Sequence, residues 1–199
     1  MLARARLARA AAALNATGRS GLPPLVLMTD DERLPDPLAA ARALPRGSMV
    51  IVRARQSSHR AKLAAELRVI ARARGLVLLI ANDSALADRV GAAGVHLPES
   101  HARAAAHWRS LRPRWLITAA AHSLATAAQA HRSGADAVFL GPVFATRSHP
   151  GGPALGAARA RLMARQLPRP VYALGGIGGQ NSAALRGFAG LAAIGALAA

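Results

Sequence analysis

The sequence predicts a single-domain α/β fold, a (β/α)₈ TIM barrel, from three observations. Short leucine-rich or β-branched segments alternate with alanine- and arginine-rich segments along the 199 residues, which indicates repeated strand–helix units with parallel strands. Eight such strands fit a compact barrel. Two of the later strands end in glycine-rich loops, at the strand ends where a barrel carries its site. A doubly wound open sheet is the alternative arrangement of the same elements.

Each predicted strand is a short run of residues typical of a buried strand. The strands are Leu25–Met28, Met49–Arg53, Leu76–Ala81, Gly94–Leu97, Trp115–Ala119, Ala137–Leu140, Val171–Leu174 and Leu191–Ile194. The helices between them are Pro37–Leu44, Ser58–Arg74, Ala85–Ala92, His101–Leu111, Leu124–Ser133, Ala154–Gln166 and Asn181–Arg186. No linker divides this region, so we expect one barrel over 25–199, preceded by a helical extension over 1–24.

The two ends of the chain predict an unusual closure of the barrel. Leu2, Leu7 and Leu14 form one apolar face of an N-terminal helix. Only residues 195–199 follow the eighth strand, so we expect a barrel that lacks its last helix. The N-terminal helix would then cover the seam between the last and first strands. The segment is basic and amphipathic, but it lacks the apolar core and cleavage site of a signal peptide.

Composition limits the functional classes. The net charge is +17, and almost all of it comes from arginine. An alanine and arginine bias of this kind is typical of a GC-rich coding background; the alternative is nucleic-acid binding, because such charge attracts phosphate. Aromatic residues make up only 3% of the chain, so platforms for base stacking are scarce. The arginines are also spread along the chain, so we expect no specific nucleic-acid partner.

The absence of cysteine excludes disulfides, thiolate catalysis and cysteine-ligated zinc. No apolar run is long enough to span a membrane, so we expect a cytoplasmic protein without a membrane partner. The sequence leaves open whether the chain forms a homo-oligomer.

Polar residues follow the second and third predicted strands. Arg53 and Arg55 are two residues apart and point the same way, which suits a phosphate or pyrophosphate group; the alternative is a pair of surface arginines. After the third strand come Asn82, a candidate phosphate-site residue, and Asp83. The Asp83 carboxylate would either hold Mg²⁺ or cap the next helix. His96, in the fourth strand, is predicted to be a core histidine with satisfied hydrogen bonds.

The later strand ends carry the acid–base and anion-binding candidates. His122 follows the fifth strand and is the best general acid/base, although a helix-capping or solvent-facing histidine is the alternative. The loop after the sixth strand offers polar side chains that suit an anion. After the seventh strand, Gly175 and Gly176 are expected to bind phosphate through backbone N–H groups at the start of the next helix. The loop candidates are Thr146, Ser148 and His149.

These segments resemble the thiamine phosphate synthase/TenI family over nearly all of 25–195. The matching segments, in chain order, are T-D-D from Thr29, V-R-A-R from Val52, N-D from Asn82, G-V-H-L-P from Gly94, A-H-S from Ala121, G-P-V-F-A-T from Gly141 and A-L-G-G-I from Ala173. The resemblance implies a (β/α)₈ barrel that acts in thiamin biosynthesis. It also implies one of two activities. A synthase couples hydroxymethylpyrimidine pyrophosphate to thiazole phosphate with Mg²⁺. A TenI-like tautomerase aromatises the thiazole carboxylate phosphate by moving a proton, and needs no cofactor.

Departures from the synthase pattern favour the TenI-like branch. Arg55 stands where the synthase has lysine, Ala120 where it has serine, and His149 where it has a pyrophosphate-binding lysine. The segment Pro98–His101 replaces a Gly-Gln-x-Asp motif that supplies a metal carboxylate. Each lost electrostatic contact typically raises the barrier by roughly 3–4 kcal/mol. Arg-x-Arg, Leu-Pro and the histidine at His122 match the TenI pattern.

The resemblance therefore predicts a thiazole tautomerase with thiazole phosphate as its substrate and His122 as its acid/base. The alternative is a thiamine phosphate synthase, with Asp83 binding Mg²⁺ and hydroxymethylpyrimidine pyrophosphate as a second substrate. A further alternative is a non-catalytic protein that binds a phosphate ligand or nucleic acid.

Overall fold

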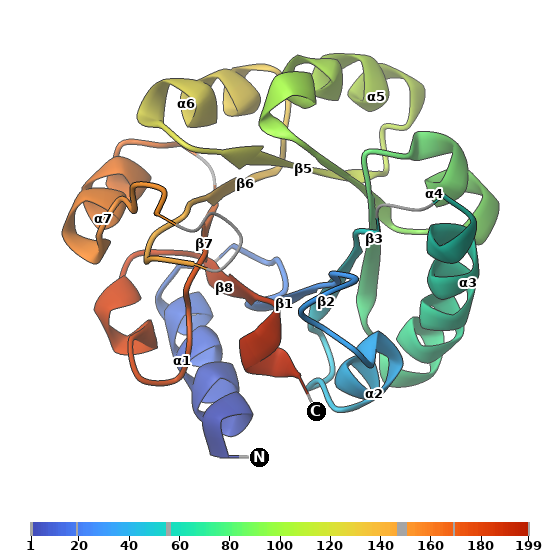
Figure 1. The fold of residues 1–199 in the computed structure, drawn as a ribbon. Coiled ribbons are helices and arrows are strands. Elements are labelled where there is room, and N and C mark those ends of the chain that lie inside the picture. The colour runs from blue at the N-terminus through green and yellow to red at the C-terminus, as the bar shows by residue number, and fades with distance from the viewer. Residues whose placement is uncertain (1, 19, 55–56, 147–150, 169, 199) are drawn as a thin grey trace.

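A computed structural model describes residues 2–18, 20–54, 57–146, 151–168 and 170–198. Eight parallel strands close into a barrel in chain order, with β1 paired to both β2 and β8, as predicted (Figure 1). The strands are β1 (Leu25–Met28), β2 (Met49–Val52), β3 (Val77–Ala81), β4 (Gly94–Leu97), β5 (Leu116–Ala121), β6 (Ala137–Leu140), β7 (Val171–Leu174) and β8 (Gly190–Ala193). The open-sheet alternative is therefore excluded.

Helices surround the barrel on its outer face (Figure 1). The α-helices are α1 (Leu2–Gly18), α2 (Pro37–Arg42), α3 (Ser57–Arg74), α4 (Ser84–Val90), α5 (Ala105–Leu111), α6 (Leu124–Arg132) and α7 (Ala157–Arg165). Three 3₁₀ segments complete the described elements: η1 (Glu99–Ala104), η2 (Ser182–Leu185) and η3 (Gly195–Leu197).

The structure corrects two predicted helices. The predicted helix over His101–Leu111 begins as the 3₁₀ segment η1 and becomes α-helical only at Ala105. The predicted helix over Asn181–Arg186 is a single 3₁₀ turn, η2. Both ends of the Asn181 side-chain amide bond to the preceding glycine turn, to the carbonyl of Gly176 and the N–H of Gly178, so this residue stabilises the turn instead of starting an α-helix.

Helix α1 packs against β8 and β1, and against η2 and η3, as predicted for a helix that covers this seam (Figure 1). Leu7, Ala11 and Leu14 are buried in the same apolar cluster as Leu25 and Leu191. Burial of an apolar helix face supplies the packing that the outer surface of strands β8 and β1 requires. The side chain of Leu2 lies outside the described part of the chain.

The core has two layers, because alternate strand residues point to opposite faces. The larger layer lies between strands and helices and contains Leu27, Val50 and Ile80. The smaller layer fills the barrel interior with Met49, Ile51, Phe139, Tyr172 and their neighbours. The Phe139 and Tyr172 rings stack with their centroids 4.8 Å apart. The barrel interior is thus packed with side chains below its site.

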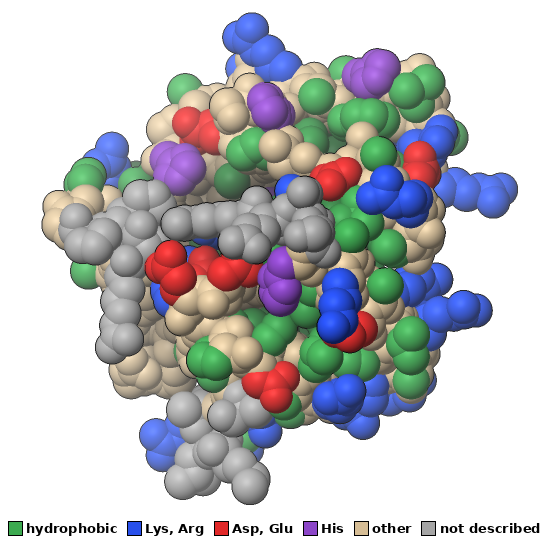
Figure 2. Space-filling view, turned by 45° about the vertical axis from the view of Figure 1, so that its right-hand side comes forward, with side chains coloured by type: hydrophobic (Ala, Val, Ile, Leu, Met, Phe, Trp, Pro, Cys, Tyr) green, Lys and Arg blue, Asp and Glu red, His purple; other side chains and the backbone are tan. Residues whose placement is uncertain are grey.

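Arginine and lysine side chains are scattered over the face seen in Figure 2, with acidic side chains among them. No continuous basic stripe, the usual sign of a nucleic-acid surface, is visible among the described residues on that face. Within the described residues, no helix combines the length and apolarity needed to cross a bilayer.

Candidate functional site

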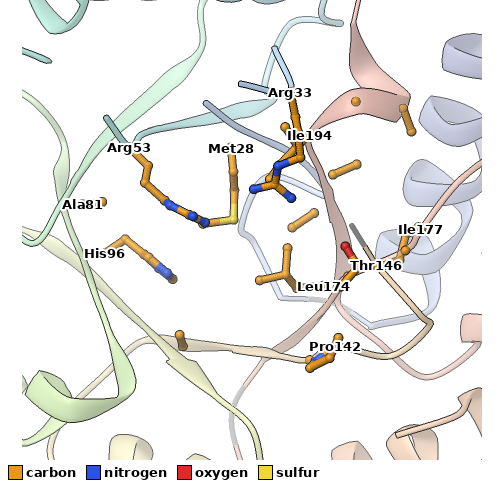
Figure 3. A pocket seen from close by; sticks show the side chains of 18 of the residues that line it. Met28, Arg33, Arg53, Ala81, His96, Pro142, Thr146, Leu174, Ile177 and Ile194 are labelled. Atoms are coloured by element: carbon orange, nitrogen blue, oxygen red, sulfur yellow. The ribbon is translucent and has the colours of Figure 1, made fainter. Parts of the chain in front are cut away.

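A pocket of about 950 Å³ opens at the carboxyl ends of the strands, where barrel enzymes carry their sites. Residues at the ends of all eight strands line it, and Figure 3 shows several of their side chains pointing inward. The lining includes Met28, Arg53, Asn82, His96, His122, Pro142, Gly175, Gly176 and Ile194. The closed barrel therefore brings together residues as far apart in sequence as Met28 and Ile194.

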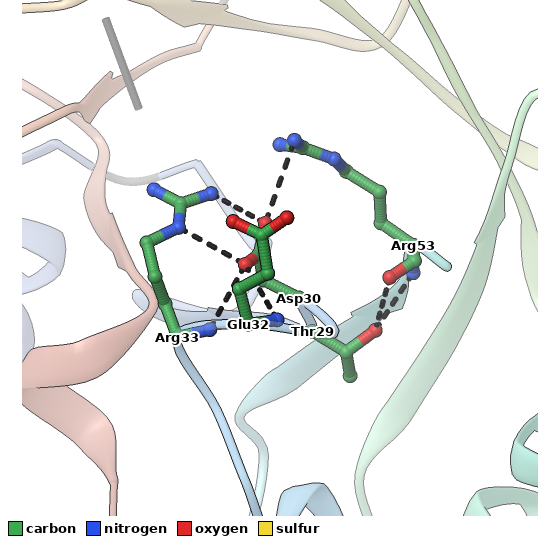
Figure 4. A network of polar contacts seen from close by, with 5 residues as sticks. All are labelled: Thr29, Asp30, Glu32, Arg33 and Arg53. Atoms are coloured by element: carbon green, nitrogen blue, oxygen red, sulfur yellow. Dashed lines mark hydrogen bonds and ion pairs between the residues drawn. The ribbon is translucent and has the colours of Figure 1, made fainter. Parts of the chain in front are cut away.

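The wall at β1 and β2 is a network of polar groups (Figure 4). The Thr29 hydroxyl accepts the Arg53 N–H at 2.8 Å and donates to the Arg53 carbonyl at 2.9 Å. The Asp30 carboxylate accepts Arg33 Nε at 3.0 Å and Nη2 at 2.5 Å. It lies 3.5 Å from Arg53 Nη2. Two guanidinium groups are thus fixed at the edge of the pocket.

Asp30 is ionised at every physiological pH. Its hydrogen bonds with Arg33, together with that arginine's charge and the backbone N–H of Glu32, outweigh the effect of burial and lower the pKa of its carboxyl from 3.8 to about 2. An ionised carboxylate with several donors holds their positions firmly.

The wall at β3 contains Asn82, whose backbone lies in the left-handed region at φ 52°, a conformation that asparagine tolerates. Its Oδ1 lies 2.7 Å from His101 Nδ1. The Asp83 carboxylate accepts the Leu86 N–H at 2.9 Å and so caps α4. It also lies 3.9 Å from Arg60 Nη1. Of the two interpretations of Asp83, the helix cap is the one the geometry supports.

His96 lies at the floor of the pocket, buried, with its ring edge against Phe139. Its Nδ1 is 2.9 Å from the Thr118 hydroxyl, in line with the expected core histidine with a satisfied hydrogen bond. Burial, with a smaller contribution from the positive charge of Arg53, lowers the pKa of His96 to about 4. The imidazole is therefore neutral at pH 7, and it adds a polar group to an otherwise apolar floor.

His122 lies at the β5 side of the pocket and contacts Glu99 at the start of η1. One Glu99 carboxylate oxygen accepts the His122 backbone N–H at 2.6 Å and lies 2.9 Å from His122 Nδ1. Burial raises the pKa of the Glu99 carboxyl, but hydrogen bonds from Thr126 and His122 outweigh it and hold that pKa below its ordinary value. An ionised Glu99 accepts a hydrogen bond from Nδ1–H, which leaves Nε2 as the ring nitrogen with a lone pair.

The wall at β6 and β7 is built from backbone. Gly175 and Gly176 have φ values of 96° and 64°, which favour glycine. A Cβ on Gly176 would lie 2.4 Å from the Ala145 carbonyl oxygen, and one on Gly175 would lie 2.7 Å from Pro142 Cα. Phe144 N–H donates to the Gly175 carbonyl at 3.1 Å. The loop after β6 therefore packs directly on this turn, with no room for side chains, and Thr146 lies beside it in the pocket lining.

The structure brings together most of the predicted site residues that it describes. Arg53, Asn82, His122, Thr146 and the two turn glycines line one pocket, and Asp83 lies outside its lining. The predicted residues Arg55, Ser148 and His149 lie outside the described residues. No α-helix follows the glycine turn, so a helix dipole gives a phosphate no support there.

Three pocket residues had no assigned role in the sequence analysis. Arg33 and Arg60 line the pocket from a loop and from α3, and neither lies at a strand end, the position that the barrel rule singles out. Glu99 reaches His122 across 23 positions. The available signal for this pair was that Glu99 follows the fourth strand and His122 follows the fifth, and that consecutive strands of a barrel are neighbours.

Mg²⁺ is the ion that the synthase alternative implies. The described residues contain no group of three histidine, aspartate or glutamate side chains placed to hold a metal. Asp83 is engaged with the α4 cap and Arg60, and Glu99 with His122. The described side chains therefore fit a protein-bound Mg²⁺ poorly, and substrate phosphate oxygens would have to supply ligands.

Comparisons with known proteins agree with this architecture. The chain is 40% identical over 154 residues to the thiamine-phosphate synthase of Anaeromyxobacter dehalogenans, covering 75% of this chain and 69% of that protein. It is 34% identical over 181 residues to the thiamine-phosphate synthase of Chlorobium luteolum, covering 88% of this chain and 85% of that protein. Some relatives are longer: the chain covers 43% of the thiamine-phosphate synthase of Parasynechococcus marenigrum.

Among solved structures, the thiamine phosphate pyrophosphorylase from Pyrococcus furiosus superposes with a TM-score of 0.75 over 86% of this chain and 85% of its own. At 24% identity, that likeness concerns the fold. The family model described as thiamine monophosphate synthase matches residues 25–197, from the first residue of β1 to the end of η3. The chain therefore belongs to the thiamine monophosphate synthase family, a family of thiamine-biosynthesis enzymes.

Proposed function

We propose that the protein is a thiazole tautomerase, which converts a non-aromatic thiazole carboxylate phosphate into its aromatic isomer. A base removes a proton from one carbon of the ligand, and an acid returns a proton to another, so the isomers have the same composition. The observation that carries this proposal is the contact between His122 and Glu99 at the edge of the pocket.

The His122–Glu99 pair has the features of a general acid/base. Glu99 holds the ring through Nδ1 and also binds the backbone N–H of the same residue, which fixes the ring's position. The negative charge of Glu99 stabilises the imidazolium that forms when Nε2 takes a proton. The same imidazolium then returns the proton, so a single histidine serves both half-reactions.

The other pocket walls supply the anchors that such a proton transfer needs. The glycine turn presents backbone to the ligand phosphate, with Thr146 beside it. Fixing the phosphate keeps the ring carbons within reach of one histidine, so the entropy cost of bringing the two together is met when the ligand binds.

The second candidate is a thiamine-phosphate synthase, and the names of the relatives favour it. Arg53, Asn82, Thr146 and the glycine turn are present in the pocket, as that activity would require. Against it stand Arg55, Ala120 and His149 at positions where the synthase pattern has lysine, serine and lysine. Stabilisation of a leaving pyrophosphate would rest on fewer positive charges and hydroxyls.

One incubation separates the two candidates. Purified protein is mixed with the non-aromatic thiazole carboxylate phosphate, hydroxymethylpyrimidine pyrophosphate and Mg²⁺, and both products are followed by chromatography. Aromatic thiazole without thiamine phosphate supports the tautomerase. Formation of thiamine phosphate would overturn it in favour of the synthase.

The His122→Ala variant tests the residue itself. We expect turnover to fall on the order of 10²- to 10⁴-fold, the usual contribution of general acid–base catalysis, with ligand affinity retained. His107→Ala is the matched control, because His107 is exposed on α5 and does not line the pocket. Equal turnover in the His122→Ala variant and the control would contradict the proposed role.

A further inference from the structure

We propose that Arg33, together with Arg53, binds the ring carboxylate, and that Arg33 selects a carboxylated thiazole phosphate over one without the carboxylate. The inference rests on the proposed function, since it names the part of the substrate that the β1–β2 wall recognises. Sequence reasoning gave Arg33 no role, because it lies in the loop after β1 and outside any strand pattern.

The first support is the placement of the two guanidinium groups. Both arginines line the pocket, and Figure 3 shows them reaching it from two sides, with the Met28 side chain between them. Thr146 and Ile177 lie on the side of the pocket away from Arg53 (Figure 3). A ligand whose phosphate lies at the glycine turn would therefore extend across the pocket towards Arg53, with Arg33 along its path (Figure 3).

The second support is that the Arg33 guanidinium is held by Asp30 before a ligand arrives, and that the same carboxylate forms an ion pair with Arg53. Asp30 binds two nitrogens of Arg33, and its oxygen lies 3.5 Å from Arg53 Nη2. Thr29 fixes both backbone polar groups of Arg53. Preorganised donors lose little conformational entropy on binding, which increases affinity. The Asp30 carboxylate takes up Nε and Nη2 of Arg33, so a ligand carboxylate would meet the opposite edge of that guanidinium group.

The third support is the charge balance of this wall. Among the described residues of this wall, two carboxylates, Asp30 and Glu32, accompany the two arginines, so these four groups together are close to neutral. A pyrophosphate with several negative charges would meet the two carboxylates at close range. A single planar carboxylate gains directed hydrogen bonds from guanidinium groups at a smaller repulsive cost. The wall therefore suits a carboxylate better than a pyrophosphate.

The test is calorimetric binding of two ligands: the aromatic thiazole carboxylate phosphate and the same thiazole phosphate without the carboxylate. For Arg33→Met, we expect affinity for the carboxylated ligand to fall about 10- to 100-fold, the usual range for hydrogen bonds to a charged group. Affinity for the other ligand should stay close to that of the wild type. Arg33→Lys keeps the charge but loses the fork, so it should restore only part of the affinity.

Arg72→Met is the matched control, because Arg72 is exposed on α3 and does not line the pocket. A thermal melt of each variant checks folding, and Arg33→Lys remains informative if Arg33→Met is unstable. Equal losses for both ligands, or no loss for either, would overturn the inference. Wild-type protein that binds the aromatic carboxylated ligand selectively but never forms it from the non-aromatic thiazole carboxylate phosphate would overturn the proposed function alone.

Discussion

The pocket has two walls that we propose to bind anions, and they are built in opposite ways. At β1 and β2, arginine side chains carry the charge; the Thr29 hydroxyl bonds to the backbone of Arg53, and the Asp30 carboxylate accepts hydrogen bonds from Arg33. At β6 and β7, the turn at Gly175 and Gly176 presents backbone, and the loop after β6 packs against it. One wall is held by ion pairs and hydrogen bonds, and the other by close packing.

The difference teaches how each wall should respond to change. Exchanging an arginine removes a contact to the ligand and leaves the barrel backbone in place. Adding a single methyl group at the glycine turn forces backbone to move. The β6–β7 wall should therefore be the less tolerant of substitution, and the β1–β2 wall the one whose specificity changes more easily.

The largest expected effect is that of Gly176→Ala. Its Cβ would lie 2.4 Å from a backbone carbonyl oxygen, at a φ of 64°. Gly21→Ala is the matched control, because Gly21 has a φ of 66° and nothing within 4 Å of its Cβ position. The backbone strain is shared, so we expect Gly176→Ala to be less stable than the control by at least about 2 kcal/mol, measured by urea unfolding.

The same two variants also test the phosphate anchor. Gly176→Ala should weaken binding of the thiazole phosphate, whereas Gly21→Ala should bind as the wild type does. If the two variants were equally stable and bound equally, the contrast between the two walls would be wrong.

A smaller effect is expected from Asp30→Asn, which removes the negative charge that holds Arg33 and Arg53 in the β1–β2 wall. The lowering of the Asp30 pKa from 3.8 to about 2 corresponds to about 2 kcal/mol of stability at neutral pH. Because the folded-state pKa is depressed, this contribution is present above pH 3.8 and is lost as the pH falls towards 2. Urea unfolding of wild type and variant at pH 7, 4 and 2.5 measures it.

We expect the two unfolding curves to differ most at pH 7 and to approach each other at pH 2.5. A difference that stayed constant over this range would show that Asp30 stabilises the wall by packing instead of by charge.

The smallest expected effect is electrostatic: the charge of Arg53, in the β1–β2 wall, acts on the pKa of His96 at the pocket floor. Burial is the larger cause of the low pKa of His96, and the charge of Arg53 is the smaller one. Arg53→Met should therefore raise the pKa of His96 from about 4, but leave it below the ordinary value of 6.5. An NMR titration of the His96 ring measures this directly, and an unchanged pKa would show that the guanidinium does not act on the floor.

The sign of the matching stability change follows from linkage. A protein with a neutral buried histidine loses stability as the pH falls from 6.5 to the pKa of that histidine in the folded state. The reason is that the unfolded chain binds the proton more tightly. The free energy of unfolding of the wild type should thus decline as the pH falls from 6.5 to about 4. In Arg53→Met, the higher pKa of His96 should end this decline at a higher pH.

Much of the barrel could be predicted from local patterns. Leu25–Met28, Gly94–Leu97, Ala137–Leu140 and Val171–Leu174 were predicted with the observed bounds, because fully buried parallel strands are continuous apolar runs flanked by polar or glycine residues. One error came where a side chain bonds to the backbone of a nearby loop. Asn181 is the example, since its amide serves the glycine turn and not a helix start.

The candidate site was predictable only in part. Arg53, Asn82 and His122 follow strands, and the barrel rule places all strand ends together. The partners of these residues depend on three-dimensional packing. Chain order brings the ends of β4 and β5 together, but only the packing shows that Glu99 contacts His122 and that Asp30 contacts both Arg33 and Arg53.

The sequence by itself determined the order of strands and helices, the buried face of α1 and the position of the pocket at the strand ends, because hydrophobic periodicity and chain order are local properties. Only the tertiary structure decided which charges meet: the barrel closes β1 onto both β2 and β8 and brings the η1 carboxylate to the β5 histidine. It also decided that Asp83 caps α4, because that bond depends on the backbone geometry at the end of β3.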